Sequence, residues 1–370
     1  MTTSDAPLTV WLMPSAYGPH RGGIEAVTAQ LARELLARGH RVVVITNQHP
    51  RELPTDEIVD GVRVLRIAYG ARRRTPGGAA RFVRDRRAAR DRLARLTPAP
   101  DVIHVHGVSS QADAALHAAR HHGAALVVTT HGEITADAHR LYEKGHARQT
   151  LREILSNAAA VTVPSRWVVQ ESERVGLPLP SGCVVVPNGL DLEAWRQVPA
   201  APATSQVALA WGRDSPEKGF PRLPPAWRVV RESLPESELK IIGQGPGEVR
   251  TTYEEIGITQ LPPASPDEVR RHLADARVVV VPSVFEAVGL VALEALAAGR
   301  AVVYSTGTGM DETIGRYGIA VDAADPEALA AAIVAAFTQP SPAPPPHELF
   351  RDWSDMAADY LALYRRVLDR

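Results

Sequence analysis

From Leu8 onward, short β-rich runs alternate with segments of helical periodicity along nearly the whole chain. Such alternation is typical of βα units, which form parallel sheets covered by helices on both faces. In the first half, strands are expected at Leu8–Met13, Val42–Thr46, Gly61–Ile67, Val102–His106, Ala125–His131 and Ala160–Pro164. In the second half, they are expected at Val207–Trp211, Leu239–Ile242, Val278–Val281 and Ala301–Tyr304. The pattern therefore predicts an α/β protein with doubly wound sheets.

The chain has 370 residues, which exceeds a typical single domain, so two domains are expected. Residues 196–206, RQVPAAPATSQ, are rich in Pro, Ala and small polar residues and indicate a linker. We therefore expect one Rossmann-like domain over residues 1–195 and a second over residues 207–345. In residues 346–370, Ser354 is expected to cap an amphipathic helix. The apolar face of that helix is made by Met356, Tyr360, Leu363, Tyr364 and Val367.

Composition excludes several classes of protein. The formal net charge is −1 and 45% of residues are hydrophobic, so neither nucleic-acid binding nor disorder is indicated. The single cysteine, Cys183, excludes an internal disulfide and favours a reducing compartment, so a cytoplasmic protein is expected. The N-terminal residues do not read as a signal peptide, and no uncharged run reaches the roughly 18 residues of a membrane span.

The stretch from Val278 to Val303 contains a candidate site. A strand of valines leads through a loop into a helix predicted from about Val288 to Gly299, where Glu294 is the one charged residue. A helix that is apolar all round is normally covered, so the Glu294 carboxylate is expected to be desolvated. Glu286 lies before the helix, where free backbone amides favour anions. Either Glu286 caps the helix and Glu294 reaches solvent, or both carboxylates face a polyhydroxyl ligand that carries phosphates.

This stretch, PSVFEAVGLVALEALAAGRAVV, resembles the E-x7-E signature of the retaining glycosyltransferases of family 4, which share the GT-B fold. The resemblance implies two Rossmann-like, doubly wound domains that face a central cleft, with a C-terminal helix that crosses back to the first domain. It also implies that Glu286 faces the donor sugar and diphosphate, and that Glu294 binds the ribose hydroxyls. At the helix mouth the donor-binding residues would be Val288, Gly289 and Leu290. The family usually has Gly-Phe where this chain has Ala287 and Val288, a change expected to reshape the sugar pocket.

Arg213 and Lys218 lie in WGRDSPEKGF, in the loop after a predicted strand. By themselves they indicate either an ordinary surface loop or two cations that converge on one anion. The segment is similar to the GR-x4-KG motif of the same family. That similarity implies that both side chains hold the donor diphosphate and neutralise it as it leaves.

Two further stretches are similar to family elements near the donor. In IIGQGPGEV, Gly243 and Gly245 follow a strand, where they either let backbone approach the nucleotide or make an ordinary strand–helix turn. GTGMDETI is similar to the family's GGxxE loop near the donor sugar. Thr308 stands in place of the first glycine, whereas Gly309 and Glu312 keep their positions.

In the first domain, Gly22 and Gly23 lie at a helix entry, where bare amides either bind phosphate or acceptor or make a plain βα turn. His131, in TTHGE, ends a predicted strand at the sheet edge where open α/β folds bind ligands. The resemblance implies that the glycines line the cleft and that His131 contacts the donor sugar. His106 is expected to line the cleft wall, and His104 to pack beside it.

Ten arginines lie between Arg72 and Arg95, and only Asp85 and Asp91 oppose them. Some family members use such a basic surface to bind anionic lipid, whereas a solvated helix face has the same composition. The interleaved alanines and the few aromatic anchors favour the solvated helix, so membrane association is not the preferred interpretation.

Together the motifs imply a retaining glycosyltransferase that moves a sugar from a nucleotide diphosphate donor, with UDP favoured, to a hydroxyl of a small acceptor. The catalytic set would be Glu286, His131, Arg213 and Lys218, because charge grows on the leaving phosphate. No D-x-D element or metal-ligand spacing occurs, so neither a metal nor a cofactor is expected. The abundance of Ala, Arg and Pro indicates a GC-rich bacterial genome, and the expected setting is secondary metabolism, such as antibiotic biosynthesis.

Three alternatives stay open. A non-hydrolysing sugar-nucleotide 2-epimerase shares the GT-B fold, but it would need acid–base carboxylates and no acceptor. A catalytically inactive binder would hold nucleotide without releasing UDP or GDP. A glycosyltransferase that acts on glycolipid or polysaccharide at a membrane surface would share the same motifs.

Overall fold

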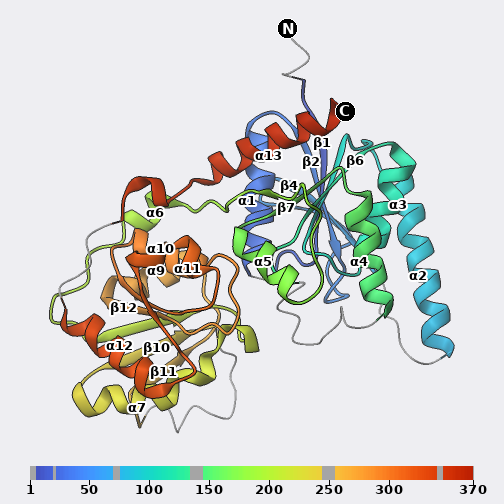
Figure 1. Ribbon diagram of the computed structural model, residues 1–370. Coiled ribbons are helices and arrows are strands. Elements are labelled where there is room, and N and C mark those ends of the chain that lie inside the picture. Colours follow the sequence, from blue (N-terminus) through green and yellow to red (C-terminus); the bar gives the residue numbers. More distant parts are fainter. Residues whose placement is uncertain are drawn as a thin grey trace. The chain divides into compact units, whose positions relative to one another are not determined.

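The computed structural model describes residues 6–19, 22–69, 76–133, 145–243, 255–339 and 345–369. The chain divides into two compact units, each with its own parallel sheet and covering helices (Figure 1). Unit 1 consists of Met1–Asn188 and Trp353–Arg370, and unit 2 of Gly189–Asp352. Among the described residues, no helix is long and apolar enough to cross a membrane.

Unit 1 contains an eight-stranded sheet in the order β3-β4-β2-β1-β5-β6-β7-β8. Its strands are β1 (Thr9–Pro14), β2 (Arg41–Asn47), β3 (Asp56–Val59), β4 (Val62–Ile67), β5 (Val102–His106), β6 (Ala125–Thr129), β7 (Ala160–Val163) and β8 (Val184–Val185). The strands pair in parallel except β3, which adds an antiparallel edge to β4. Strand order reverses between β1 and β5, and in open α/β sheets ligands bind at the carboxyl ends of strands at such a switch point.

Six helices are described in unit 1. They are α1 (Gly23–Ala37), α2 (Pro76–Ala94), α3 (Ala112–His122), α4 (Gly145–Asn157), α5 (Arg166–Arg174) and α13 (Trp353–Leu368). Helices α1 and α13 pack together on one side of the sheet, and α2, α3 and α4 lie on the other (Figure 1). The C-terminal helix therefore belongs to the first unit, and the five residues predicted for its apolar face are all buried.

The predicted cap of α13 is wrong. The helix begins at Trp353, so Ser354 lies inside its first turn. The Ser354 hydroxyl and carbonyl oxygens instead accept hydrogen bonds from the Arg38 guanidinium, at 2.9 and 3.0 Å. This side chain therefore ties α13 to the end of α1.

Unit 2 contains a six-stranded parallel sheet in the order β11-β10-β9-β12-β13-β14. Its strands are β9 (Val207–Trp211), β10 (Glu238–Ile242), β11 (Ile258–Leu261), β12 (Ala276–Val281), β13 (Ala301–Ser305) and β14 (Ile319–Val321). Its helices are α6 (Leu192–Arg196), α7 (Leu223–Ser233), α9 (Pro266–Asp275), α10 (Leu290–Ala297), α11 (Met310–Thr313) and α12 (Pro326–Thr338). The valine strand β12 is central and buried, as predicted, and strand order reverses between it and β9.

Residues 196–206, predicted to link the domains, are instead part of unit 2, and the boundary between the units follows Asn188. The composition of this segment indicated a free linker, but hydrogen bonds to its backbone carbonyl oxygens hold the segment against the rest of unit 2. The Arg277 guanidinium donates to the Ala203 carbonyl oxygen at 2.8 Å, and Arg300 donates to that of Pro199. Just before it, α6 packs against α10, and the side chain of its residue Trp195 is buried.

Helix α10 begins two residues later than predicted. Gly289 is its N-cap and has φ +77°, a conformation that glycine adopts without strain. The backbone therefore cannot be helical at Val288, and the first residue of the helix is Leu290. A Cβ at Gly289 would also overlap the Met310 side chain, so the turn needs glycine for two reasons.

Candidate active site

Lys218 and Glu286 form an ion pair at the carboxyl edge of the unit 2 sheet. Lys218 Nζ lies 2.6 Å from Glu286 Oε2, and the two side chains are 23% and 15% exposed. Lys218 ends the 3-10 helix η3 (Pro216–Lys218), which follows β9, and Glu286 lies in the loop after β12. Because β9 and β12 are neighbours at the switch point, their loops bring together residues 68 positions apart.

The loops that carry this pair are held together by their backbones. The amides of Val284 and Phe285 donate to the carbonyl oxygen of Glu217, at 2.8 and 3.3 Å. In the other direction, the Arg222 guanidinium donates to the carbonyl oxygen of Pro282 at 3.1 Å. These bonds satisfy backbone groups at the two strand ends and restrict the positions from which the charged side chains project.

Two glycines allow this close approach. Gly219 has φ +66°, and a Cβ there would overlap the carbonyl oxygen of Pro282. Gly243 has φ +109°, and a Cβ there would overlap the carbonyl oxygen of Gly212. Both glycines thus have a packing role, and donor binding by Gly243 stays a prediction. Gly245 lies outside the described residues.

The loop before α11 packs against the loop of Glu286. The Gly309 N–H donates to the Glu286 carbonyl oxygen at 2.7 Å, and a Cβ on Gly309 would overlap the carbonyl oxygen of Ala287. Thr308 is tolerated in place of glycine because its φ is not positive and its buried hydroxyl donates to a backbone carbonyl oxygen at 2.9 Å. Glu312 lies exposed on α11, beside this loop.

Glu294 is half-buried on α10, so its side chain lies between the two alternatives that the sequence left open. Burial raises the pKa of its carboxyl group from the ordinary 4.5 to about 8. A hydrogen bond from the Trp211 side chain and the positive charges of Lys218 and Arg270 act against this rise in pKa, but do not cancel it. The Glu294 carboxyl is therefore mostly protonated at neutral pH, and a protonated carboxyl can both donate and accept hydrogen bonds.

Trp211 is a site residue that sequence reasoning missed. It ends β9, and its indole ring stacks on that of Trp195 with ring centroids 6.3 Å apart. The Arg270 guanidinium lies over the other indole, 5.3 Å from the Trp195 ring centroid. The stack fixes the indole that donates to Glu294. Its one sequence signal was a tryptophan directly before the Gly-Arg pair at a strand end.

The remaining predicted donor residues differ in their exposure. Arg213 is exposed, and no described residue pairs with it. The Val288 side chain is buried, so this residue can offer a ligand only its backbone. Its carbonyl oxygen already accepts a hydrogen bond from the Thr313 hydroxyl at 2.6 Å. Gly289 and Leu290 begin α10, where the first amides lack an acceptor within the helix.

In unit 1, His131 and His106 lie together at the carboxyl edge of the sheet. His106 ends β5, and its Nδ1 lies 3.1 Å from Nε2 of His131, which follows β6. Burial lowers the pKa of His131 to about 4 and that of His106 well below its ordinary value, so both imidazoles are neutral at physiological pH. His104, expected only to pack, is bonded to His106 as well, with nitrogen atoms 3.2 Å apart.

Glu133 supports this edge and was also missed. Its carboxylate oxygens accept hydrogen bonds from the backbone amides of His131 and Val108, at 2.7 and 2.8 Å.

Gly22 and Gly23, predicted to line the cleft, lie at the start of α1. The helix begins at Gly23, with extended backbone at Gly22 and no side-chain cap. A Cβ on Gly23 would meet nothing within 4 Å, so open space surrounds this helix start within the described structure.

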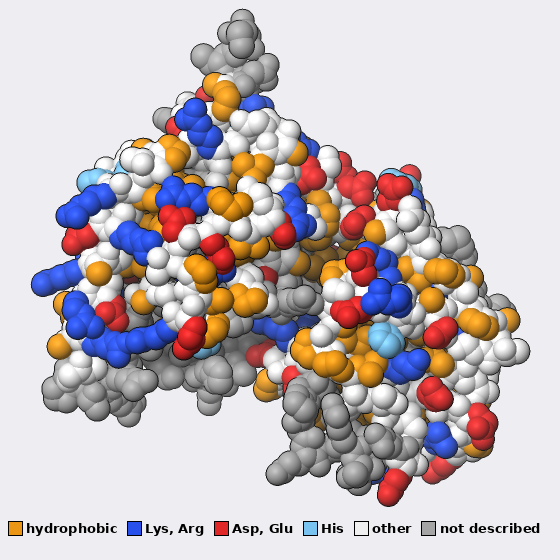
Figure 2. Space-filling view, turned by 180° about the vertical axis from the view of Figure 1, so that it is seen from behind, with side chains coloured by type: hydrophobic (Ala, Val, Ile, Leu, Met, Phe, Trp, Pro, Cys, Tyr) orange, Lys and Arg blue, Asp and Glu red, His pale blue; other side chains and the backbone are white. Residues whose placement is uncertain are grey.

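The arginines of α2 are partly used in packing. Arg86 and Arg90 both pair with Asp113 of α3, and Arg92 donates to the backbone carbonyl oxygens of Arg66 and Thr55. Figure 2 shows basic and acidic side chains interspersed on the face that it presents. Arg86, Arg90 and Arg92 therefore have partners within unit 1, and the preference for a solvated helix over a lipid-binding surface stays a prediction.

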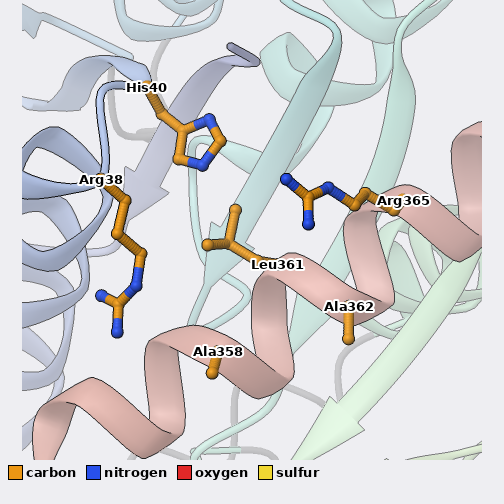
Figure 3. A pocket seen from close by; sticks show the side chains of 6 residues that line it. All are labelled: Arg38, His40, Ala358, Leu361, Ala362 and Arg365. Carbon is orange, nitrogen blue, oxygen red and sulfur yellow. The ribbon is translucent and has the colours of Figure 1, made fainter. Parts of the chain in front are cut away.

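A separate hollow of about 400 Å³ lies elsewhere in unit 1, between the end of α1 and α13 (Figure 3). It is lined by Arg38, His40, Ala358, Leu361, Ala362 and Arg365. None of the predicted site residues lines it.

Comparison with known proteins gives matches over most of the chain. Residues 21–194 match the family described as Glycosyltransferase Family 4, and residues 205–339 match the family described as Glycosyl transferases group 1. The first matched segment ends six residues after the boundary between the units, and the second lies within unit 2.

Two curated relatives are of similar length. A phosphatidyl-myo-inositol mannosyltransferase of Mycolicibacterium smegmatis is 28% identical over 85% of this chain and 80% of the relative. A D-inositol 3-phosphate glycosyltransferase of Thermobispora bispora is 28% identical over 94% of this chain and 91% of the relative. Among solved structures, sucrose-phosphate synthase of Thermosynechococcus elongatus has a TM-score of 0.71 at 19% identity, and the match covers 98% of this chain and 99% of that one.

Proposed function

We propose a function on the premise that this chain belongs to the family 4 glycosyltransferases and has the GT-B fold. The chain transfers a sugar from a UDP-sugar to a hydroxyl of a small acceptor, with retention of configuration. The observation that carries the proposal is the Lys218–Glu286 pair at the switch point of unit 2, beside the half-buried carboxyl of Glu294, whose pKa is raised. A cation, a carboxylate and a protonated carboxyl match the phosphate, sugar and ribose of such a donor.

The donor nucleotide would bind across the carboxyl edge of β9 and β12. Glu294, oriented by its bond to Trp211, would bind the ribose hydroxyls. Lys218, Arg213 and the first amides of α10 would surround the diphosphate. Glu286 already neutralises Lys218, so the bound diphosphate would share that cation, while the Glu286 carboxylate turns to the hydroxyls of the sugar.

Transfer needs stabilisation of the leaving group. As the bond between the anomeric carbon and the β-phosphate oxygen breaks, negative charge grows on that oxygen, and the Lys218 and Arg213 cations stabilise it. The acceptor hydroxyl oxygen bonds to the anomeric carbon on the same face, and its proton passes to the departing phosphate. Atoms and charge balance without a protein nucleophile, so we propose a reaction that depends on neither metal nor cofactor.

The relatives guide the choice of acceptor. Both curated names contain inositol. It is D-inositol 3-phosphate in the name of the Thermobispora bispora relative and phosphatidyl-myo-inositol, a lipid, in that of the Mycolicibacterium smegmatis relative. A phosphorylated inositol is therefore the first small acceptor to test.

The test is an assay of the purified full chain with UDP-glucose, UDP-N-acetylglucosamine and GDP-mannose, each with and without D-inositol 3-phosphate. We expect acceptor-dependent release of a nucleoside diphosphate, an α-linked glycoside by NMR, and no effect of a chelator. Conversion of the donor into its C2 epimer in the absence of acceptor, with the nucleotide still attached, would indicate the epimerase instead. Nucleotide binding without turnover on any donor, across a wider acceptor panel, would overturn the proposal.

A further inference from the structure

A continuous series of hydrogen-bonded side chains runs from the C-terminal helix to His131. The Tyr364 hydroxyl of α13 lies 2.6 Å from Nδ1 of His104. That same Nδ1 lies 3.2 Å from Nε2 of His106, whose Nδ1 in turn lies 3.1 Å from Nε2 of His131. On its other side, Nε2 of His104 lies 2.6 Å from the Thr129 hydroxyl.

The members of this series are uncharged, and all are buried except His131 at its end, which is partly exposed. Tyr364, His104, His106 and Thr129 are each 0% exposed. A neutral imidazole has one N–H and one lone pair, so the proton position on one ring decides what its neighbour can do. Two arrangements of the series are therefore conceivable, with every proton shifted in one direction or in the other.

The Tyr364 hydroxyl decides between them. Among the described residues, Nδ1 of His104 is its one hydrogen-bond partner, and a buried hydroxyl that donates to nothing is costly. Tyr364 therefore donates, and Nδ1 of His104 carries the lone pair. The proton of His104 is then on Nε2, from which it is donated to the Thr129 oxygen.

The next two rings follow from the first. Nε2 of His106 faces the lone pair of His104, and two lone pairs at 3.2 Å would repel, so His106 carries its proton on Nε2. Its Nδ1 is then an acceptor, and the group that can donate to it is Nε2 of His131. We propose that Tyr364, His104 and His106 are positioning residues that hold His131 as the Nε2–H tautomer, with Nδ1 as an acceptor for a hydroxyl of the donor sugar.

The ligand part of this inference rests on the proposed function. No described residue bonds to Nδ1 of His131, while the bond between its backbone amide and Glu133 holds the residue in place. A lone pair on Nδ1 accepts a hydrogen bond from a hydroxyl group and repels a group that can only accept hydrogen bonds. The series therefore makes the enzyme selective for a hydroxyl at one carbon of the sugar.

Two variants change the series in steps. Tyr364→Phe removes the deciding donor, so we expect a mixture of His131 tautomers and a fall in kcat of about twofold. The double variant Thr129→Val, Tyr364→Phe also removes the acceptor for Nε2 of His104. A buried N–H without an acceptor is unfavourable, so every proton should shift and His131 should carry its proton on Nδ1. Tyr69→Phe is the matched control, because Tyr69 is buried in unit 1 and its hydroxyl has no described partner.

The direct measurement is two-bond ¹H–¹⁵N NMR of histidine-labelled protein. We expect the Nε2–H tautomer of His131 in the wild type and in Tyr69→Phe, and the Nδ1–H tautomer in the double variant. The second measurement uses donors in which each sugar hydroxyl in turn is replaced by fluorine, which cannot donate. One such donor should be used at least about tenfold less well than its parent by the wild type, and the double variant should narrow that gap.

An Nδ1–H tautomer of His131 in the wild type would overturn the inference. So would a double variant that leaves the preference among the fluorinated donors unchanged. Absence of any sugar transfer would instead count against the proposed function, since the tautomer is read from the spectrum without turnover.

Discussion

Lys218 Nζ lies 2.6 Å from Glu286 Oε2, although the two residues belong to different motifs 68 positions apart. The pair joins the loop after β9 to the loop after β12. Each charge compensates the other, so neither side chain is left as an isolated charge at the sheet edge. A donor diphosphate that reaches this point would meet a cation whose geometry is already restricted.

Replacing Lys218 by alanine should reduce kcat by at least about a hundredfold, because charge on the leaving phosphate loses a stabilising cation. Stability should change by no more than about 1 kcal/mol, since the pair is partly exposed to solvent. Steady-state kinetics and thermal unfolding measure the two effects. Lys240→Ala, in β10 of the same sheet, is the matched control, and wild-type turnover by Lys218→Ala would refute the role.

Glu294→Gln should make the protein more stable at neutral pH but weaken nucleotide binding. The folded state keeps the Glu294 carboxyl protonated up to pH of about 8, whereas the unfolded chain releases that proton near its ordinary pKa of 4.5. Between these values the folded state binds more protons, so its stability falls as pH rises. A neutral glutamine removes that loss, and we expect a gain of about 1 to 3 kcal/mol at pH 7.

Denaturant unfolding of both proteins from pH 4 to pH 9 tests this prediction. The wild type should lose stability relative to Glu294→Gln across the window from about 4.5 to about 8. Parallel stability curves in that window would show that the Glu294 pKa is ordinary. Calorimetric titration with UDP measures the expected loss of affinity separately.

Trp211→Phe should weaken nucleotide binding by about fivefold, because Glu294 loses its hydrogen-bond donor and the carboxyl is no longer oriented. Loss of that bond should also raise the Glu294 pKa further. Trp227→Phe provides the control, because Trp227 is fully buried in unit 2 and its indole N–H has no described partner. Equal UDP affinity in the two variants would argue against a role for Trp211 in the site.

Gly309→Ala should destabilise the protein by about 1 to 3 kcal/mol, because the new Cβ would overlap the carbonyl oxygen of Ala287. The same overlap displaces the loop of Glu286, so kcat should fall as well. Gly182→Ala, in an exposed turn with nothing within 4 Å of the added Cβ, should leave both quantities unchanged. Thermal unfolding and steady-state kinetics measure both quantities, and equal stability and kcat in the two variants would contradict the prediction.

Local patterns in the sequence predicted the central strands of both sheets. The strands Val102–His106 and Val207–Trp211 were predicted with their observed bounds, because a short, mainly apolar run between turn residues is typical of a buried strand. The edge strand β3 was missed because it lacks such an apolar run. The strand β3 is half-exposed and short, so its residues have no apolar pattern that separates them from a loop.

What the sequence determined by itself was the order of βα units, the buried helix around Glu294, and two separate motifs that contain Lys218 and Glu286. These features depend on periodicity and on residues within one or two turns of each other. Only the tertiary structure decided that Lys218 pairs with Glu286, that Trp211 donates to Glu294, and that Tyr364 bonds to His104, 260 positions away. Such contacts follow from strand order and from the packing of α13, which periodicity along the chain does not encode.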